Sequence, residues 1–406
     1  MFDLQLDWDL PAKISSLDSR HVLRVRLTPQ ANVPQLPLQM AIALDTSSSM
    51  RGDKLEAAKA ACRTVMGQLR DGDRLSLASF ATGVSPLGES RQDPQHLQGA
   101  INSLQADGVT RTDLALAWLH EQLPPAQGLA RVAVLITDGH ATNRQGRHLE
   151  DSSPLLERVR EFANGGITLF TVGLGDAANF NTDFLVQLGD RGRGGFLYAD
   201  DPSQLDPQLQ EQFRRCQAIG VEDLQLNLTP LNQASVESFC RYRPDYLPLE
   251  ETASNQLILS AVSANEPTDI LIEVRVPPLG FNESLSEQEV LQLEVQGPGI
   301  TPMTAQAAIA HTQSYKAAQQ VNRDVERDRL GWDININSSE LPRVQDPNRT
   351  GELLTNIHVA ASKSGRSDIM QQASQQLQTL QQSGQLSPAQ VTGLLRDTRR
   401  TNNNDS

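Results

Sequence analysis

The chain is poor in cysteine and has no long apolar run, and we expect no secretory signal at its start. Its three cysteines are an odd number at wide spacing, which argues against a disulfide framework and against a CxxC zinc site. No stretch of about 18 apolar residues occurs, so we expect no membrane-spanning helix. The first residues, MFDLQLDWDL, lack the basic start and apolar run of a secretory signal. We therefore expect a cytoplasmic protein.

Basic clusters are also scarce. The net charge is −14, and basic residues gather only in short pairs such as Arg214–Arg215 and Arg399–Arg400. A nucleic-acid-binding protein usually concentrates basic residues on one face, so we expect no nucleic-acid partner. Hydrophobic residues make up 38% of the chain, enough for a packed core. At roughly 100–200 residues per domain, the length predicts two or three domains.

Two segments alternate apolar and polar residues with the period of a half-buried strand, namely residues 1–37 and 216–310. The second segment predicts an antiparallel β-sandwich. The first segment is too short to form a sheet of its own. We therefore expect its strands to join that sandwich.

Between these segments, residues 38–215 follow a different pattern. Short apolar runs such as Ala130–Thr137 (ARVAVLIT) alternate with helical periodicity such as that of Lys54–Leu69. Strands that alternate with helices are typical of βαβ units and of a mostly parallel, doubly wound sheet. The fold class expected is therefore an α/β, Rossmann-like domain inserted in an antiparallel β-sandwich.

The remaining residues, 311–398, predict a helical C-terminal tail. Apolar spacing favours helices over Tyr315–Leu330, Asp368–Ser383 and Ser387–Leu395. The polar stretch Asn335–Gly351 predicts a loop. The end of the chain, residues 399–406, is polar (ending TNNNDS) and predicts disorder.

One candidate site begins where the first strand of the α/β region ends. Asp45, Ser47 and Ser49 follow a D-x-S-x-S spacing, just before a helix. In open α/β sheets, ligands bind at the carboxyl ends of the strands. Carboxylate and hydroxyl oxygens are hard ligands that suit Mg²⁺ or Mn²⁺ better than zinc.

Two further segments are expected to converge on the same edge of the sheet. Thr110 lies in a loop before a helix, and Asp138 ends the most apolar strand. The combined set has only two carboxylates. Because Mg²⁺ prefers octahedral geometry and keeps waters when few carboxylates are offered, an open coordination position is expected.

Together these segments resemble the metal-ion-dependent adhesion site of von Willebrand factor A (VWA) domains. The match comprises D-x-S-x-S at 45–49, the threonine of Gly-x-Thr at 108–110 and the aspartate of T-D-G at 137–139. It extends to Val172–Asp176 and covers about residues 38–213. D-x-S-x-S alone would be weak, whereas three motifs in order, each at a strand end or loop, are specific. The flanking sandwich and tail resemble those of bacterial VWA proteins in architecture.

The resemblance implies a metal-dependent protein-binding module and not an enzyme. Ser47 and Ser49 would bind Mg²⁺ or Mn²⁺ directly. Thr110 would bind it directly or through water, and Asp45 and Asp138 mostly through water. An Asp or Glu carboxylate of a partner protein would fill the open position.

Other interpretations remain open. Serine and threonine at a strand-to-helix turn also act as helix caps, and the site could be a degenerate one that binds no metal. The chain could be an accessory subunit of a separate AAA+ ATPase, as in chelatases, since it has no G-x-x-x-x-G-K-[ST] loop itself. A metal-dependent hydrolase is disfavoured, because no convincing general base stands near the motif. His140 as a rim residue, and Asp113 as a helix cap or as an acid behind the metal, are left undecided.

Overall fold

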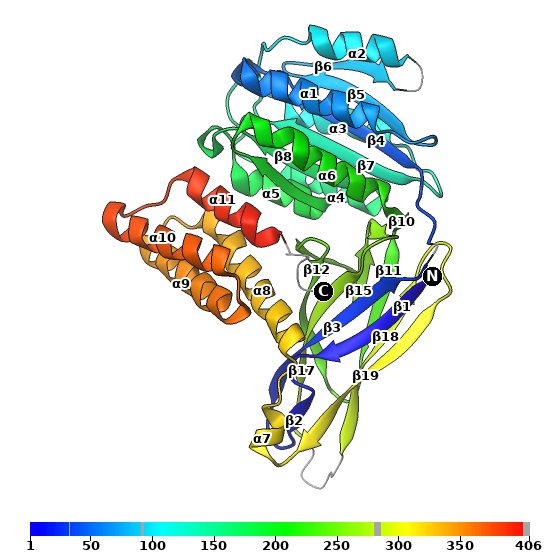
Figure 1. The fold of residues 1–406 in the computed structure, drawn as a ribbon, viewed down its shortest axis with the longest axis vertical. Coiled ribbons are helices and arrows are strands. Elements are labelled where there is room, and N and C mark those ends of the chain that lie inside the picture. Colours follow the sequence, from blue (N-terminus) through cyan, green and yellow to red (C-terminus); the bar gives the residue numbers. More distant parts are fainter. Residues whose placement is uncertain (32, 91–92, 280–285, 401–406) are drawn as a thin grey trace. The chain divides into compact units, whose positions relative to one another are not determined.

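The computed structural model describes residues 1–31, 33–90, 93–279 and 286–400. The chain forms two compact units, drawn in Figure 1. The α/β unit consists of Pro34–Glu222 and Ser387–Arg396. The sandwich unit consists of Met1–Val33, Asp223–Leu386 and the end of the chain from Asp397.

The α/β unit is built on a six-stranded sheet of order β6-β5-β4-β7-β8-β9, in which β6 is antiparallel and the others are parallel. Every residue of β7 and β8 is buried, as expected of central strands covered on both faces. This confirms the fold class predicted from the sequence. The strands are β4 (Leu38–Asp45), β5 (Arg74–Phe80), β6 (Val84–Glu89), β7 (Ala130–Thr137), β8 (Thr168–Leu174) and β9 (Arg193–Ala199), followed by the short β10 (Ile219–Val221).

Helices cover both faces of this sheet. Ala41 and Ala43 of β4 share a core with α3, α4 and α5, so the alternate residues of the strand face the layer formed by α1 and α6. The helices are α1 (Asp53–Gly67), α2 (Pro94–Ser103), α3 (Thr112–Gln122), α4 (Ser153–Asn164), α5 (Thr182–Arg191) and α6 (Leu205–Gln217). Three short 3-10 turns, η1 (Ser48–Met50), η2 (Ala177–Asn179) and η3 (Pro202–Gln204), lie in the connections.

The sandwich unit contains two sheets of order β1-β3-β17-β12-β13 and β14-β15-β11-β18-β19-β2. The N-terminal β3 pairs with β17, more than two hundred residues later in the chain, so the ends of the unit are joined in one sheet. Its strands are β1 (Phe2–Trp8), β2 (Ala12–Ile14), β3 (Ser19–Pro29), β11 (Leu224–Pro230), β12 (Ser235–Arg243), β13 (Leu247–Pro248), β14 (Glu251–Ala253), β15 (Gln256–Leu259), β16 (Val262–Ser263), β17 (Thr268–Val276), β18 (Glu287–Gln296) and β19 (Met303–Thr312).

The helical tail differs from the prediction. It comprises α7 (Tyr315–Ala318), α8 (Arg323–Glu340), the 3-10 turn η4 (Leu341–Arg343), α9 (Pro347–Ser364), α10 (Ser367–Ser383) and α11 (Pro388–Arg399). None of the described helices is long and apolar enough to cross a membrane.

Two predictions for the tail were wrong. The single helix over Tyr315–Leu330 is interrupted, because Asn322 leaves helical geometry and caps a new helix by accepting a hydrogen bond from Asp324 N. The polar stretch Asn335–Gly351 is mostly helical, because it comprises the end of α8, the 3-10 turn η4 and the start of α9, with only residues 344–346 outside them. Its polarity was misleading, because Asn335 and Ser338 are buried with hydrogen-bond partners inside the tail.

The predicted disordered end also needs correction. Arg399 is the buried last residue of α11, and Arg400 forms an isolated β-bridge with Asp245. The remainder of that prediction, residues 401–406, lies outside the described residues.

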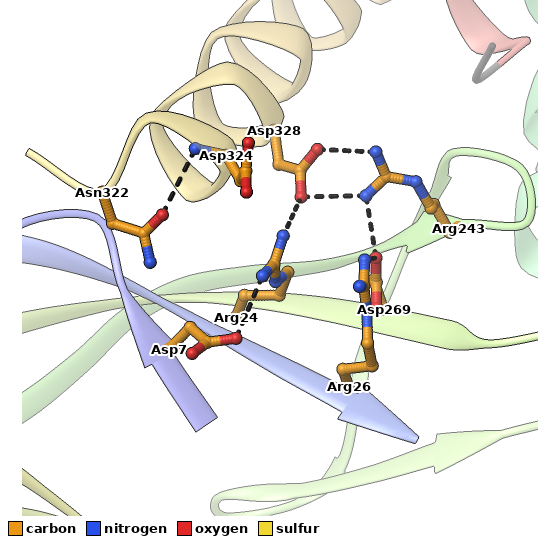
Figure 2. A network of polar contacts seen from close by, with 8 residues as sticks. All are labelled: Asp7, Arg24, Arg26, Arg243, Asp269, Asn322, Asp324 and Asp328. Atoms are coloured by element: carbon orange, nitrogen blue, oxygen red, sulfur yellow. Dashed lines mark hydrogen bonds and ion pairs between the residues drawn. The ribbon is translucent and has the colours of Figure 1, made fainter. Parts of the chain in front are cut away.

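A network of buried ion pairs fixes α8 to the first sheet of the sandwich unit (Figure 2). Asp328 of α8 accepts from Arg24 of β3 at 3.0 Å and from Arg243 of β12 at 2.8 Å. Asp269 of β17 accepts from Arg26 at 2.7 Å and from Arg243 at 2.8 Å. Burial opposes ionisation of Asp269, but its two arginine partners outweigh burial and hold its pKa below the usual value.

Candidate metal centre

Asp45 is the last residue of β4, immediately before the loop that carries Ser47 and Ser49. Its carboxylate is fully buried, and Oδ1 accepts a hydrogen bond from Ser47 N at 2.7 Å. Oδ2 accepts from Thr137 Oγ1, at the end of the neighbouring β7, at 2.5 Å. Burial raises the pKa of Asp45 to about 6 although both hydrogen bonds favour the ionised form. The carboxylate therefore stabilises the shape of the loop through these hydrogen bonds, although burial makes its charge unfavourable.

The two serines and Asp138 form a chain of contacts beside Asp45. Ser47 Oγ lies 3.1 Å from Ser49 Oγ, and Ser49 Oγ donates to Asp138 Oδ1 at 2.7 Å. Asp138 is fully buried one residue beyond β7, which pairs with β4. Because adjacent parallel strands end at the same edge, the two acidic motifs meet as the sequence predicts.

Thr110 belongs to the same cluster. A Cβ atom added to Gly139 would lie 3.1 Å from Thr110 Oγ1 and 3.5 Å from Ser49 Oγ. Both hydroxyls therefore border the same small space beside the glycine that follows Asp138. Thr142 fixes the position of Thr110, since its N and Oγ1 donate to Thr110 O at 2.8 and 3.0 Å.

The loop that carries Thr110 is attached to the loop after β4. Ser48 N and Oγ both donate to Gly108 O, at 3.1 and 3.2 Å, and Asp107 N donates to Thr46 O at 2.8 Å. The exposed Ser48 thus connects the two loops and is not one of the five clustered residues. The predicted set of Asp45, Ser47, Ser49, Thr110 and Asp138 is brought together by these contacts.

Sequence reasoning missed Lys54, in the first turn of α1. Its Nζ donates to Asp138 Oδ2, while only 23% of the lysine side chain is exposed. Its aliphatic part lies over Gly175, where an added Cβ would approach Lys54 Cδ to 3.0 Å. The available signal was a cationic residue in the first turn of the helix that follows the D-x-S-x-S motif.

Two residues left open by the sequence have other partners in the structure. Asp113 pairs with Arg111 through contacts of 2.8 and 2.6 Å. Burial opposes its ionisation, but Arg111 outweighs burial and holds the pKa of Asp113 below its usual value. The ring of His140 stacks on that of His148 with centroids 4.3 Å apart, and burial followed by the charge of His148 lowers the pKa of His140.

The donors in the cluster fit a hard cation. The cluster offers three hydroxyls and two carboxylates, which is the oxygen chemistry that Mg²⁺ and Mn²⁺ prefer. The residues described contain no group of three or more His, Cys, Asp or Glu side chains able to hold a metal. A site here therefore depends on serine and threonine hydroxyls as much as on acids.

Comparison with known proteins agrees with this geometry. Residues 40–140, which include all five clustered residues, match the family model of the von Willebrand factor type A domain. The chain is 27% identical over 266 residues to the uncharacterized protein sll0103 of Synechocystis, covering 62% of this chain and 61% of that protein. It is 26% identical over 181 residues to human inter-alpha-trypsin inhibitor heavy chain H1, covering 42% of this chain and 19% of the heavy chain. The chain thus spans less than two thirds of both relatives.

Two solved structures share the fold along almost the whole chain. The von Willebrand factor type A protein from Catenulispora acidiphila has a TM-score of 0.78 at 16% identity, covering 98% of this chain and 97% of that one. The ArnB paralog VWA2 from Sulfolobus acidocaldarius has a TM-score of 0.62 at 16% identity, covering 98% of both chains. Together with the family model matched by residues 40–140, these likenesses show that the chain has the fold of von Willebrand factor type A proteins.

Proposed function

We propose that the α/β unit is a metal-dependent protein-binding module in which Mg²⁺ or Mn²⁺ captures a carboxylate of a partner protein. The observation that carries the proposal is the convergence of three hydroxyls and two buried carboxylates from three loops at one edge of the sheet. VWA domains often mediate contacts between proteins, which supports the same conclusion.

Each residue has a distinct part in this proposal. Ser47, Ser49 and Thr110 would offer neutral oxygens to the cation, and Asp45 and Asp138 would supply negative charge. With so few anionic ligands, a bound cation would keep a strong attraction for an external carboxylate oxygen. The hydrogen bonds of Asp45 to Ser47 N and Thr137 Oγ1 hold the loop in its shape.

The surroundings of the site also support an acidic partner. Thr142 and His148 form a β-bridge, and the hairpin between them carries the exposed Arg144 and Arg147. Thr142 is the residue that bonds to Thr110. Two exposed arginines on a segment attached to the metal loop would attract an acidic segment, although the whole chain has a net charge of −14.

We also propose that the chain is not itself an enzyme. Both oxygens of Asp45 accept hydrogen bonds from Ser47 and Thr137, and both oxygens of Asp138 are bound by Ser49 and Lys54. These carboxylates are engaged in holding the site and do not stand as free general bases.

Calorimetric titration of Mg²⁺ and Mn²⁺ into chelator-treated protein tests the function. We expect the wild type to bind and Asp45→Ala to lose binding, because the variant removes one of the two carboxylates. Asp107→Asn is the matched control, since Asp107 is an exposed acid on the neighbouring loop and should leave affinity unchanged. Equal metal affinity in Asp45→Ala and the wild type would refute the proposal.

A further inference from the structure

Lys54 occupies a position in α1 that is unfavourable for a cation. It lies in the first turn of α1, where the helix dipole disfavours a cation. A surface lysine would normally extend into water, yet this side chain turns inward and its ammonium meets the fully buried Asp138. The stability of the helix therefore does not explain why Lys54 pairs with Asp138.

The fold provides a path for the lysine side chain. Gly175, at the end of β8, has φ of +84°, and the space where its Cβ would stand borders Cδ, Cε and Nζ of Lys54 at 3.0, 3.7 and 3.8 Å. Gly175 belongs to the segment Val172–Asp176, which shares the sequence resemblance but contributes nothing to the five-residue cluster. Its role in this fold is to leave room for Lys54.

The lysine and a metal ion would use the same carboxylate. Asp138 Oδ1 accepts from Ser49, and Oδ2 accepts from Lys54. A cation bound among the five residues would meet a carboxylate already neutralised by an ammonium, and it would repel that ammonium in a buried setting where like charges interact strongly.

We propose that Lys54 is a built-in counter-ion that competes with the metal for Asp138 and lowers the metal affinity of the site. This inference rests on the proposed function. In the metal-free protein the lysine stabilises a buried carboxylate that would otherwise be unpaired. In the loaded protein, one divalent cation and Lys54 exceed the charge of Asp45 and Asp138 by one. That excess favours an incoming carboxylate, so the partner completes the charge balance.

Titration of Mg²⁺ alone into chelator-treated wild type, Lys54→Met and Lys54→Arg tests the competition. We expect Lys54→Met to bind about tenfold or more tightly than the wild type, equivalent to about 1.4 kcal/mol. Lys54→Arg keeps the charge and should bind like the wild type. Unchanged or weaker binding by Lys54→Met would overturn the inference while leaving the proposed function intact.

Thermal unfolding gives a second measurement. In chelator, Lys54→Met should unfold about 3 °C or more below the wild type, because Asp138 loses its counter-ion, and saturating Mg²⁺ should remove the difference. A merely structural lysine would leave the difference in place, which would overturn the inference. If neither protein bound Mg²⁺, both the inference and the proposed function would fail. Binding by Lys54→Met alone would support the inference.

Discussion

At the scale of single residues, Asp45 combines two opposing effects. Burial disfavours its charge, whereas hydrogen bonds from Ser47 N and Thr137 Oγ1 favour it. Burial dominates, and the pKa rises to about 6. A carboxyl group that is harder to ionise when folded gains a proton more readily in the native state. The metal-free fold should therefore become more stable as the pH falls through 6 toward the ordinary pKa of an aspartate.

This pH dependence can be measured by denaturant unfolding in chelator. Relative to the wild type, Asp45→Asn should be more stable by about 1–3 kcal/mol at pH 7.5, because it removes a buried charge without changing the side-chain shape. At pH 4.5 the difference should shrink to about a third, because Asp45 is then mostly protonated in the folded protein but still mostly ionised in the unfolded chain. A difference that is equal at both pH values would show that ionisation of Asp45 is not its source.

At the scale of elements, the attachment of α8 illustrates how charges hold a helix to a sheet. Asp328 is 2% exposed and binds arginines from two different strands, as Figure 2 shows. A buried ion pair adds little relative to apolar packing, but removal of one partner leaves the other charge unpaired. The network should therefore respond strongly to the loss of its central acid.

We expect Asp328→Ala to lower the free energy of unfolding of the sandwich unit by about 3–5 kcal/mol. Asp333→Ala is the matched control on the same helix, because Asp333 is 44% exposed and pairs with Arg329 at the surface. The control should cost no more than about 1 kcal/mol. Urea unfolding of both variants measures the difference, and similar losses would mean that the network adds nothing specific.

At the scale of the whole molecule, the end of the chain contributes to a core formed mostly by residues far earlier. Ser387–Arg396 belongs to the α/β unit, whereas the expected boundaries of 38–215 for that domain did not include it. Leu395 is fully buried in the core with α3, α4 and α5, and Thr392 Oγ1 lies 2.8 Å from Thr182 Oγ1. Residues 387–396 therefore complete the unit that holds the candidate metal site.

Leu395→Ala should destabilise the α/β unit by about 2–5 kcal/mol, since it removes buried methyl groups and leaves a cavity. Ala389→Ser, at an exposed position of the same helix, should change stability by less than about 0.5 kcal/mol. Thermal unfolding followed by circular dichroism compares the two variants. If Leu395→Ala lost no more stability than Ala389→Ser, this segment would not be part of the domain's stable core.

The sequence by itself determined the α/β fold and the grouping of the five candidate residues. Strand periodicity is local, and parallel strands place their carboxyl ends at one edge, so Asp45 and Asp138 had to meet. The three hydroxyl ligands could also be predicted, because they lie at fixed places in motifs next to these strand ends. Metal binding by this set stays a prediction, as do the cytoplasmic location and a protein partner that supplies an Asp or Glu carboxylate.

Only the tertiary structure decided the contacts between segments that share no local pattern. The pair of Lys54 with Asp138 depends on where α1 starts and on the space left by Gly175. The polarity of Asn335 and Ser338 favours a loop, but the structure buries both residues in the helical tail, where they form hydrogen bonds. The place of Leu395 in the α/β core is likewise set by packing. Such contacts join residues distant in the chain, and periodicity carries no information about them.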